Sequence, residues 1–187
     1  MIQIYTAKIS DSQKFFNDLC FENANEAEKE RSPQSKAALF LLHEGLKVDF
    51  RSFSGLKIAV GDTGKPYFVT SGGEPAKLWF NLSHSGDYTI CAISDSHEVG
   101  VDIQKILPAK MNVAKRIFST EQYTSLLEKE GAARDSLFCA YWVLYESALK
   151  LHGGRVLEKA DISCASLVDD APRGYRVALA VRENKGE

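Results

Sequence analysis

Apolar residues recur along the chain with two different spacings, and each spacing predicts one kind of element. Short apolar or alternating runs bounded by glycine, proline or serine predict strands. We expect strands at residues 2–9, 56–60, 67–70, 78–82, 88–93, 99–103, 162–168 and 175–181. Apolar residues three or four positions apart predict helices. We expect these at residues 33–44, 113–118, 119–128 and 132–152, with a further helix that begins at Ser10 or Asp11 and carries Phe15, Phe16 and Leu19.

Capping and turn residues set the expected ends of these elements. Ser32, followed by a proline, is a good start for a helix that Gly45 is expected to end. Ser119, with a glutamine three residues later, forms a capping box, and Gly153 should end the longest helix. The polar residues 83–86 are expected to form a break between two strands.

Length and composition indicate a compact protein. The 187 residues suit one large domain or two small lobes that share a core, and 44% of them are hydrophobic. A net charge of -2 argues against general binding to nucleic acids or to anionic membranes. No apolar run is long enough to cross a bilayer, so we expect a cytoplasmic protein. The four cysteines are far apart in apolar surroundings, which is typical of buried free thiols; they are Cys20, Cys91, Cys139 and Cys164.

One acid interrupts the most apolar part of the chain. Asp102 lies between Val101 and Ile103 in the predicted strand 99–103. Burying an unpaired carboxylate costs several kcal/mol, roughly, so the pattern predicts a metal ion or another cation as the partner of Asp102.

The predicted helix 132–152 carries two informative charges, because apolar residues cover most of its circumference. Glu146 and Lys150 are four residues apart and share a face. One interpretation is an ordinary helix ion pair on a narrow solvent strip, worth a few tenths of a kcal/mol, roughly. The other is that Glu146 and Asp102 bind one divalent cation while Lys150 contacts an anion held by it. Oxygen ligands without a cysteine or histidine cluster favour magnesium over zinc.

Four further side chains are candidate donors if the substrate group is a phosphate. Lys65 stands between a glycine and a proline in a predicted turn, and Lys36 lies near the start of helix 33–44. Ser83 and His84 complete the set. An ordinary solvent-exposed lysine remains the alternative interpretation for both lysines.

These motifs, in their order and spacing, resemble those of the 4′-phosphopantetheinyl transferases of the Sfp type, which load carrier proteins with the arm of coenzyme A. Together they cover most of residues 30–155. The matching pieces are Gly64-Lys65-Pro66-x-Phe68, Phe80-Asn81-Leu82-Ser83-His84-Ser85, Gly100-Val101-Asp102-Ile103, Phe118-Ser119-x-x-Gln122-Tyr123 and Trp142-x-x-x-Glu146-Ser147-x-x-Lys150.

The resemblance implies a fold, a reaction and its partners. The fold would be α+β, with two similar lobes, each a small antiparallel sheet packed with helices, and a ligand cleft between them. We assign residues 1–105 to the N-terminal lobe and residues 106–187 to the C-terminal lobe. The reaction would transfer the 4′-phosphopantetheine arm of coenzyme A to a serine of an apo acyl or peptidyl carrier protein, with release of 3′,5′-ADP. Mg²⁺ would be the cofactor and the protein would be a monomer.

The resemblance also implies roles for single residues. Asp102 and Glu146 would bind Mg²⁺ on the pyrophosphate. Glu146 would accept the proton of the carrier serine, directly or through a metal-bound water, and Lys150 would neutralise the phosphate oxygens. Many relatives carry a second acid two residues after the aspartate, where this chain has Gln104, a neutral oxygen donor that still suits Mg²⁺. Relatives often have a lysine before the helix glutamate, where this chain has Tyr145.

The nucleotide end of coenzyme A would lie with the remaining candidates. Lys65 and His84 would hold the 3′-phosphate, with assistance from Ser83 and with Lys36 near the same nucleotide. Two alternatives belong to other functional classes. One is a non-catalytic protein that binds coenzyme A or a carrier protein. The other is a structural or interaction protein in which Asp102 and Glu146 are ordinary paired core acids.

Overall fold

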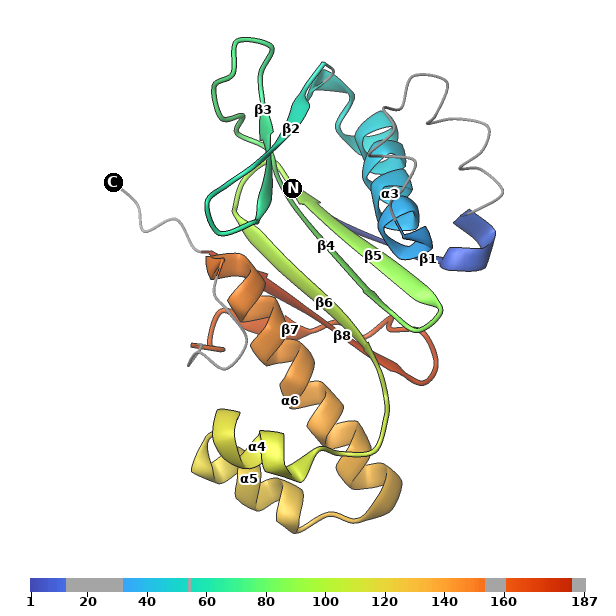
Figure 1. Cartoon of the computed structure of the whole chain (residues 1–187), viewed down its shortest axis with the longest axis vertical. Coiled ribbons are helices and arrows are strands. Elements are labelled where there is room, and N and C mark those ends of the chain that lie inside the picture. Colours follow the sequence, from blue (N-terminus) through green and yellow to red (C-terminus); the bar gives the residue numbers. More distant parts are fainter. Residues whose placement is uncertain (13–31, 54, 154–160, 183–187) are drawn as a thin grey trace.

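The computed structural model describes residues 1–12, 32–53, 55–153 and 161–182. These residues form two three-stranded antiparallel sheets and one two-stranded hairpin. They also form the helices labelled α3, α4, α5 and α6 in Figure 1. The elements are β1 (Ile2–Lys8), α3 (Pro33–Asp49), a short 3-10 helix (Arg51–Phe53), β2 (Lys57–Val60), β3 (Pro66–Val69), β4 (Trp79–Ser85), β5 (Tyr88–Ser94), β6 (Val99–Lys105), α4 (Met111–Ile117), α5 (Thr120–Leu127), α6 (Gly131–His152), β7 (Ala165–Leu167) and β8 (Tyr175–Val181). The helix predicted to begin at Ser10 or Asp11 starts within the described residues, where 9–12 are helical. Its predicted core residues Phe15, Phe16 and Leu19 lie outside the described residues.

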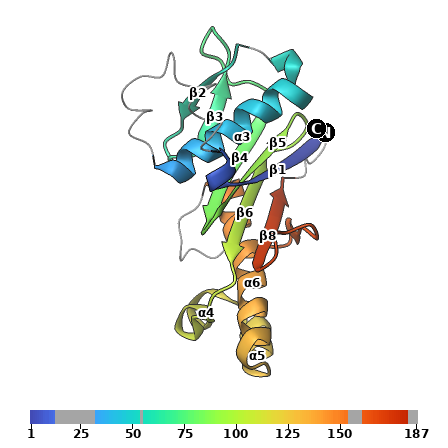
Figure 2. The same cartoon turned by 90° about the vertical axis from the view of Figure 1, so that its right-hand side faces the viewer.

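Each large sheet has one long helix on one face. The first sheet has the strand order β1-β5-β4 and packs against α3, and the second has the order β6-β8-β7 and packs against α6. In Figure 2, α3 passes in front of the strands of the first sheet, while β6 and β8 pass in front of α6. The prediction of an α+β fold built from small antiparallel sheets packed with helices is confirmed.

Alternation along the strands sends apolar side chains to two separate cores. Cys91 and Ile93 of β5 face α3, together with Phe80 of β4. Ile90 and Ala92 of the same strand point the other way and meet the apolar side of the second sheet, including Val101. The faces of the two sheets that the helices leave uncovered therefore pack on each other, which gives the order helix, sheet, sheet, helix.

The two sheets meet at the edge strands β4 and β6, and side chains rather than a backbone ladder join them. The backbone N–H of Val101 donates to Asn81 Oδ1 at 2.9 Å, and that of Lys105 donates to Ser85 Oγ at 3.0 Å. Because the residue numbers rise together on both strands, β4 and β6 run parallel. We call this boundary the seam. Strand β6 pairs along its whole length with β8, so the strand that we assigned to the N-terminal lobe hydrogen-bonds within the second sheet.

Two predicted ends were wrong. Residues 83–85 do not break the chain but continue β4, and the turn consists of Gly86 and Asp87, since Ser85 pairs with Tyr88. Gly45 does not end its helix, because α3 continues to Asp49. A Cβ at Gly45 would lie 2.6 Å from Tyr5 Cε2, so this glycine permits close packing of α3 on the sheet.

Most other local predictions were right. The capping box at Ser119 is present, and Gly153 caps α6 in the left-handed region with φ of 69°. Cys91 and Cys139 are buried free thiols, as predicted, whereas Cys164 is free but only half-buried, which corrects the prediction for this residue. Cys20 lies outside the described residues. Within the described residues, no helix has the length and apolar character needed to span a membrane.

Candidate active site

Asp102 lies at the seam, buried between the two sheets and α6. Its exposed fraction is 5%, and one of its oxygens is fully occupied. Oδ1 accepts hydrogen bonds from Ser83 Oγ at 2.8 Å and from Lys150 Nζ at 2.6 Å. The other oxygen, Oδ2, is buried and has no hydrogen-bond partner among the described residues. A buried carboxylate oxygen without a partner is costly, so this half of Asp102 is suited to a further donor or a cation.

Gly100 allows α6 to approach β6 closely enough to bring Lys150 to Asp102. A Cβ at this position would lie 2.2 Å from the carbonyl oxygen of Ser147 and 2.5 Å from the backbone nitrogen of Leu151. These are backbone atoms of a long helix, so they cannot turn aside as the end of a flexible side chain can. Gly100 and Asp102 project from the same side of β6, because they are two residues apart. The glycine of the Gly-Val-Asp motif therefore permits the close packing of α6, and the aspartate binds the ammonium group of Lys150 on that helix.

Ser83 joins the two charged groups. Its hydroxyl donates to Asp102 and accepts a hydrogen bond from Lys150 Nζ at 2.8 Å. Asn81, Ser83 and Ser85 are alternate residues of β4, and each bonds across the seam. The structure therefore places Ser83 as the residue that orients Asp102, in addition to any contact with a ligand.

Glu146 lies one helical turn before Lys150 and is half-buried. Within the described part of the chain, no ion pair joins Glu146 to Lys150, whose ammonium group is bonded to Asp102 instead. The interpretation of these two residues as a simple helix pair is therefore wrong. Burial raises the pKa of the Glu146 carboxyl above its ordinary value, and the nearby charge of Asp102 raises this pKa further, against the opposing effect of Lys150. Two acids and one ammonium group leave this cluster with a net charge of about -1 when all are ionised.

Replacing Glu146 by glutamine is expected to stabilise the fold at neutral and alkaline pH. Because the pKa of Glu146 is higher in the folded chain than its ordinary value of 4.5, ionisation costs the folded state free energy. That cost is absent well below the ordinary pKa and complete once the pH exceeds the raised pKa. We expect Glu146→Gln to raise the melting temperature by a few degrees, roughly, near pH 8, and the difference to vanish near pH 4. Differential scanning calorimetry across this range measures it.

A matched control for this prediction is Glu121→Gln at the start of α5. The pKa of Glu121 is lowered, and the largest cause is a hydrogen bond with the Ser119 side chain. Ionisation of Glu121 therefore favours the folded state. The two glutamine variants should therefore shift the melting temperature in opposite directions at pH 8. A parallel response of both would contradict the assignment of Glu146 to a desolvated site.

Gln104 and Tyr145, the two departures from the family pattern, have different surroundings. Gln104 is half-buried on β6 and shares a strand side with Asp102, and its backbone oxygen accepts the Cys139 thiol at 3.4 Å. Tyr145 is only 3% exposed, and its ring lies 5.8 Å from that of Trp142. Tyr145 lines a cavity of about 650 Å³ between the start of α5 and α6. At the position where relatives often have a lysine, this chain therefore has a buried aromatic side chain that forms part of the cavity wall.

Lys65 lies at the other end of α6 from the helices α4 and α5. Its Nζ donates to the carbonyl oxygen of Leu151 at 3.0 Å, in the last turn of the helix. Burial lowers the pKa of the Lys65 ammonium group, partly offset by Glu98. The turn before it also touches α6, because a Cβ at Gly153 would lie 2.9 Å from Thr63 Oγ1. The hairpin of β2 and β3 thus fastens to the end of the helix that carries Glu146 and Lys150.

The two remaining candidates lie on the first sheet and its helix. His84 is exposed on β4, where it pairs with Thr89 near the β4–β5 turn. Lys36 is half-buried in the first turn of α3, which starts at the predicted cap Ser32. The structure therefore brings Asp102, Ser83 and Lys150 into direct contact, and it places Lys65 and His84 near different ends of the seam. Their shared role at one phosphate stays a prediction.

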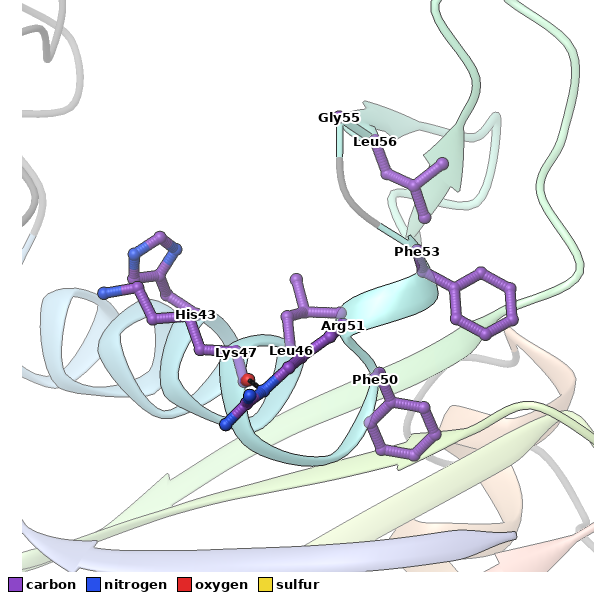
Figure 3. A pocket seen from close by; sticks show the side chains of 8 residues that line it. All are labelled: His43, Leu46, Lys47, Phe50, Arg51, Phe53, Gly55 and Leu56. Atoms are coloured by element: carbon purple, nitrogen blue, oxygen red, sulfur yellow. Dashed lines mark hydrogen bonds between the residues drawn. The ribbon is translucent and has the colours of Figure 1, made fainter.

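A cavity of about 500 Å³ lies away from these residues, between the C-terminal part of α3 and the segment that precedes β2 (Figure 3). Leucine and phenylalanine side chains form much of its wall. The residues that line it are His43, Leu46, Lys47, Phe50, Arg51, Phe53, Gly55 and Leu56. None of the candidate residues is among them, so this cavity is separate from the site at Asp102.

Two contributions to the site were missed at the level of sequence. Gly100 stood in a recognised motif, but no role was assigned to it, because only the position of α6 shows what its missing side chain permits. Asn81 holds β6 at Val101, and its signal was the alternation of Asn81, Ser83 and Ser85 along a strand whose other residues are mainly apolar.

Comparison with known proteins finds one matching protein family. The family model of the 4′-phosphopantetheinyl transferase superfamily matches residues 98–186, which include β6, α6 and β8. This part of the chain, residues 98–186, is similar to the superfamily. The superfamily match contains Gly100, Asp102, Glu146 and Lys150, whereas Ser83 lies on the strand across the seam.

Individual relatives of the superfamily carry the same description. A 4′-phosphopantetheinyl transferase of Bacillus subtilis is 34% identical over 119 residues, which are 63% of this chain and 50% of the relative. The 4′-phosphopantetheinyl transferase Sfp of Bacillus subtilis (strain 168) is 42% identical over 100 residues, 54% of this chain and 42% of the relative. The 4′-phosphopantetheinyl transferase AcpT of Salmonella typhi is 36% identical over 100 residues, 52% of this chain and 50% of the relative. The matched part of the chain thus spans about half the length, or less, of these transferases.

Proposed function

We propose that the chain transfers the 4′-phosphopantetheine group of coenzyme A to a serine hydroxyl of an apo acyl or peptidyl carrier protein and releases 3′,5′-ADP. One observation carries the proposal: the buried Asp102 has one oxygen held by Ser83 and Lys150 and a second oxygen without a described partner. Asp102 and Lys150 lie in the part of the chain that is similar to the 4′-phosphopantetheinyl transferase superfamily, and similar proteins bear the transferase name.

The residues at the seam fit a magnesium ion as the cofactor. Asp102 Oδ2 and the carboxylate of Glu146 are hard oxygen donors, and the amide oxygen of Gln104 is a third candidate. Among the described residues, no group of three histidine, cysteine, aspartate or glutamate side chains could hold a metal by itself. Mg²⁺ suits such a sparse set, because it is usually held by one or two carboxylates together with waters and substrate phosphates.

A bound Mg²⁺ would supply positive charge to the pyrophosphate of coenzyme A. Lys150 would add to this charge from the protein side. Its side chain is 28% exposed, against 7% for Asp102, so the ammonium group has room to leave Asp102 and contact a phosphate oxygen. Lys150 would then stabilise the charge that grows on the oxygens as the bond to 3′,5′-ADP breaks.

Glu146 would act as the general base. As the serine oxygen forms its bond to the phosphorus that bears the pantetheine arm, the serine proton passes to the Glu146 carboxylate and the bond to the 3′,5′-ADP oxygen breaks. The raised pKa of Glu146 suits this role, because a base is most effective when its pKa lies closer to the working pH. Transfer should therefore fall as the pH drops through this raised pKa.

We assign the nucleotide end of coenzyme A to Lys65, His84 and Lys36, as the family resemblance implies. Lys65 is supported by its half-buried position beside α6, since a phosphate there would compete for an ammonium group that now contacts only a carbonyl oxygen in its described surroundings. The cytoplasmic location and the monomeric state are part of the same proposal.

Mass spectrometry of an apo carrier protein tests the proposed activity. The carrier is incubated with the chain, coenzyme A and Mg²⁺, and the expected result is a mass gain of one phosphopantetheine group. A carrier whose serine is replaced by alanine is the control and should gain nothing. Absence of a gain with several apo carriers and a folded enzyme would contradict the proposal.

The same samples separate the proposed enzyme from the two other classes. Binding of coenzyme A in calorimetry without any mass gain would favour a non-catalytic binding protein, which the neutral Gln104 makes worth testing. A melting temperature unchanged by coenzyme A and Mg²⁺ together would favour a structural protein, because a ligand that binds only the folded state must stabilise it.

Replacing Gln104 by glutamate is expected to strengthen the binding of Mg²⁺. The new carboxylate would stand on the same strand side as Asp102 and add a charged oxygen to a sparse ligand set. We expect the Mg²⁺ concentration for half-maximal transfer to fall by about tenfold, on the order of the effect of one altered metal contact. Gln122→Glu, at the start of α5, is the matched control and should leave this concentration unchanged. An unchanged requirement in Gln104→Glu would exclude Gln104 from the metal site.

A further inference from the structure

A further cavity, apart from the two described above, lies where the ends of both large sheets come together. Its volume is about 650 Å³. The segments that form it are the end of β1, the start of α3, the β4–β5 turn, the end of β6 and the residues before β8. In Figure 1 the β4–β5 turn and the segment before β8 lie next to each other at the right. The residues that line the cavity are Lys8, Ile9, Ser10, Gln34, Gly86, Asp87, Tyr88, Lys105, Arg173 and Tyr175.

The charges around this cavity do not balance. Three of its side chains are cationic and only Asp87 is anionic. Asp87 is already engaged, since its Oδ2 lies 3.7 Å from Lys105 Nζ and accepts the Tyr175 hydroxyl at 3.4 Å. For Lys8 and Arg173, no side-chain hydrogen bond or ion pair is found with any other described residue. Two positive charges from different elements therefore face the cavity without an anionic partner, although the chain as a whole has a net charge of -2.

The wall of the cavity is preformed. Tyr175 is 4% exposed, and its hydroxyl accepts the backbone N–H of Asp87 at 3.1 Å. Its ring packs edge-on against Tyr88, with 4.9 Å between the ring centroids. A Cβ at Gly86 would lie 2.6 Å from the Tyr175 hydroxyl oxygen, so the turn fits closely around this phenol. A buried phenol and an aromatic pair thus provide a packed surface beside the exposed cationic side chains.

We propose that this cavity binds a small phosphate monoester, with the phosphate between Lys8 and Arg173 and the organic part against Tyr88. A phosphate monoester carries a charge of about -2 above its second pKa near 6, which matches the two uncompensated cations. Arginine binds phosphate through two parallel donors, and lysine contributes a point charge. The residues that line the cavity include none of the residues assigned to the transfer reaction, neither Asp102, Glu146 and Lys150 nor the nucleotide candidates Lys65, His84 and Lys36, so the proposed site is a separate set of residues.

Calorimetry with phenyl phosphate at pH 8 tests the proposal on the full chain. We expect the double variant Lys8→Gln/Arg173→Gln to bind phenyl phosphate at least tenfold more weakly than the native chain. Lys77→Gln/Lys110→Gln removes the same charge from exposed lysines elsewhere and should bind as the native chain does. Phenyl sulfonate, a monoanion of similar shape, should bind more weakly than phenyl phosphate to the native chain.

A third variant separates this cavity from the candidate active site. Lys150→Met should bind phenyl phosphate as the native chain does, and Lys8→Gln/Arg173→Gln should retain transfer activity. Both side chains of that double variant are exposed, so it should fold, and an unchanged melting temperature checks this. Absence of binding to the native chain would overturn the proposal. Equal weakening in the two double variants, or loss of binding in Lys150→Met alone, would overturn it as well.

Discussion

Gly100→Ala is expected to destabilise the fold by about 3 kcal/mol, which is at the upper end of the cost of overpacking a core. The added methyl group would stand 2.2 Å from the Ser147 carbonyl oxygen and 2.5 Å from the Leu151 nitrogen, so α6 would have to move away from β6. That movement would also withdraw Lys150 from Asp102. Thermal unfolding followed by circular dichroism should show a melting temperature lower by roughly 10 °C for a chain of this size.

Gly72→Ala is the matched control for this substitution. The nearest atom to a Cβ at Gly72 is Thr70 Oγ1 at 3.7 Å, which is an ordinary contact. This variant should unfold at nearly the native temperature. If Gly100→Ala unfolded within a degree or two of Gly72→Ala, α6 would not be seated on β6 as described.

Asp102→Asn is expected to reduce phosphopantetheine transfer by about 10³-fold, comparable with the loss of a preorganised electrostatic group in other active sites. The asparagine keeps the shape of the side chain and an oxygen that can accept a hydrogen bond from Ser83. It removes the negative charge that pairs with Lys150 and that the proposed metal site would use. Binding of Mn²⁺, followed by its paramagnetic signal, should be lost together with activity. Lys150 is partly exposed and can reach solvent, so the variant should remain folded.

Asp170→Asn, at an exposed position in the segment between β7 and β8, provides the comparison for the removal of one carboxylate. Its activity and its Mn²⁺ binding should equal those of the native chain. Transfer by Asp102→Asn within tenfold of Asp170→Asn would show that the charge of Asp102 is not needed for the reaction, and the metal site would then have to be sought elsewhere.

Features that depend on neighbouring residues in sequence were predicted well. The capping box at Ser119 and the left-handed cap at Gly153 need only a few consecutive residues, and the last strand has the predicted bounds, Tyr175–Val181. Gly45 was misjudged because its local appearance is that of a helix stop, whereas its place inside α3 is set by the Tyr5 ring and Ile93 of another element. Residues 83–85 were misjudged for a similar reason, since two of these polar side chains find partners on β6.

The candidate site, too, was predictable only where it depends on neighbouring residues in the sequence. The burial of Asp102 followed from its apolar neighbours, and the shared face of Glu146 and Lys150 followed from helical spacing. Their spatial relation did not follow, because the choice of Lys150 between Glu146 and Asp102 depends on how closely α6 approaches β6 at Gly100. The same contact explains why a residue without a side chain matters as much to the site as the charged ones.

The seam between the sheets is also a place where the two halves of the molecule can separate during local unfolding. Within a sheet, each strand is held by a ladder of backbone hydrogen bonds, but Val101 and Lys105 of β6 offer their amide protons to single side chains of β4. Amide exchange at these two positions should therefore be faster than in the centres of β5 and β8, because it requires only that the halves part at the seam. Asp102 lies at this seam, so a ligand bound by residues of both halves would hold the two sheets together where no backbone ladder joins them.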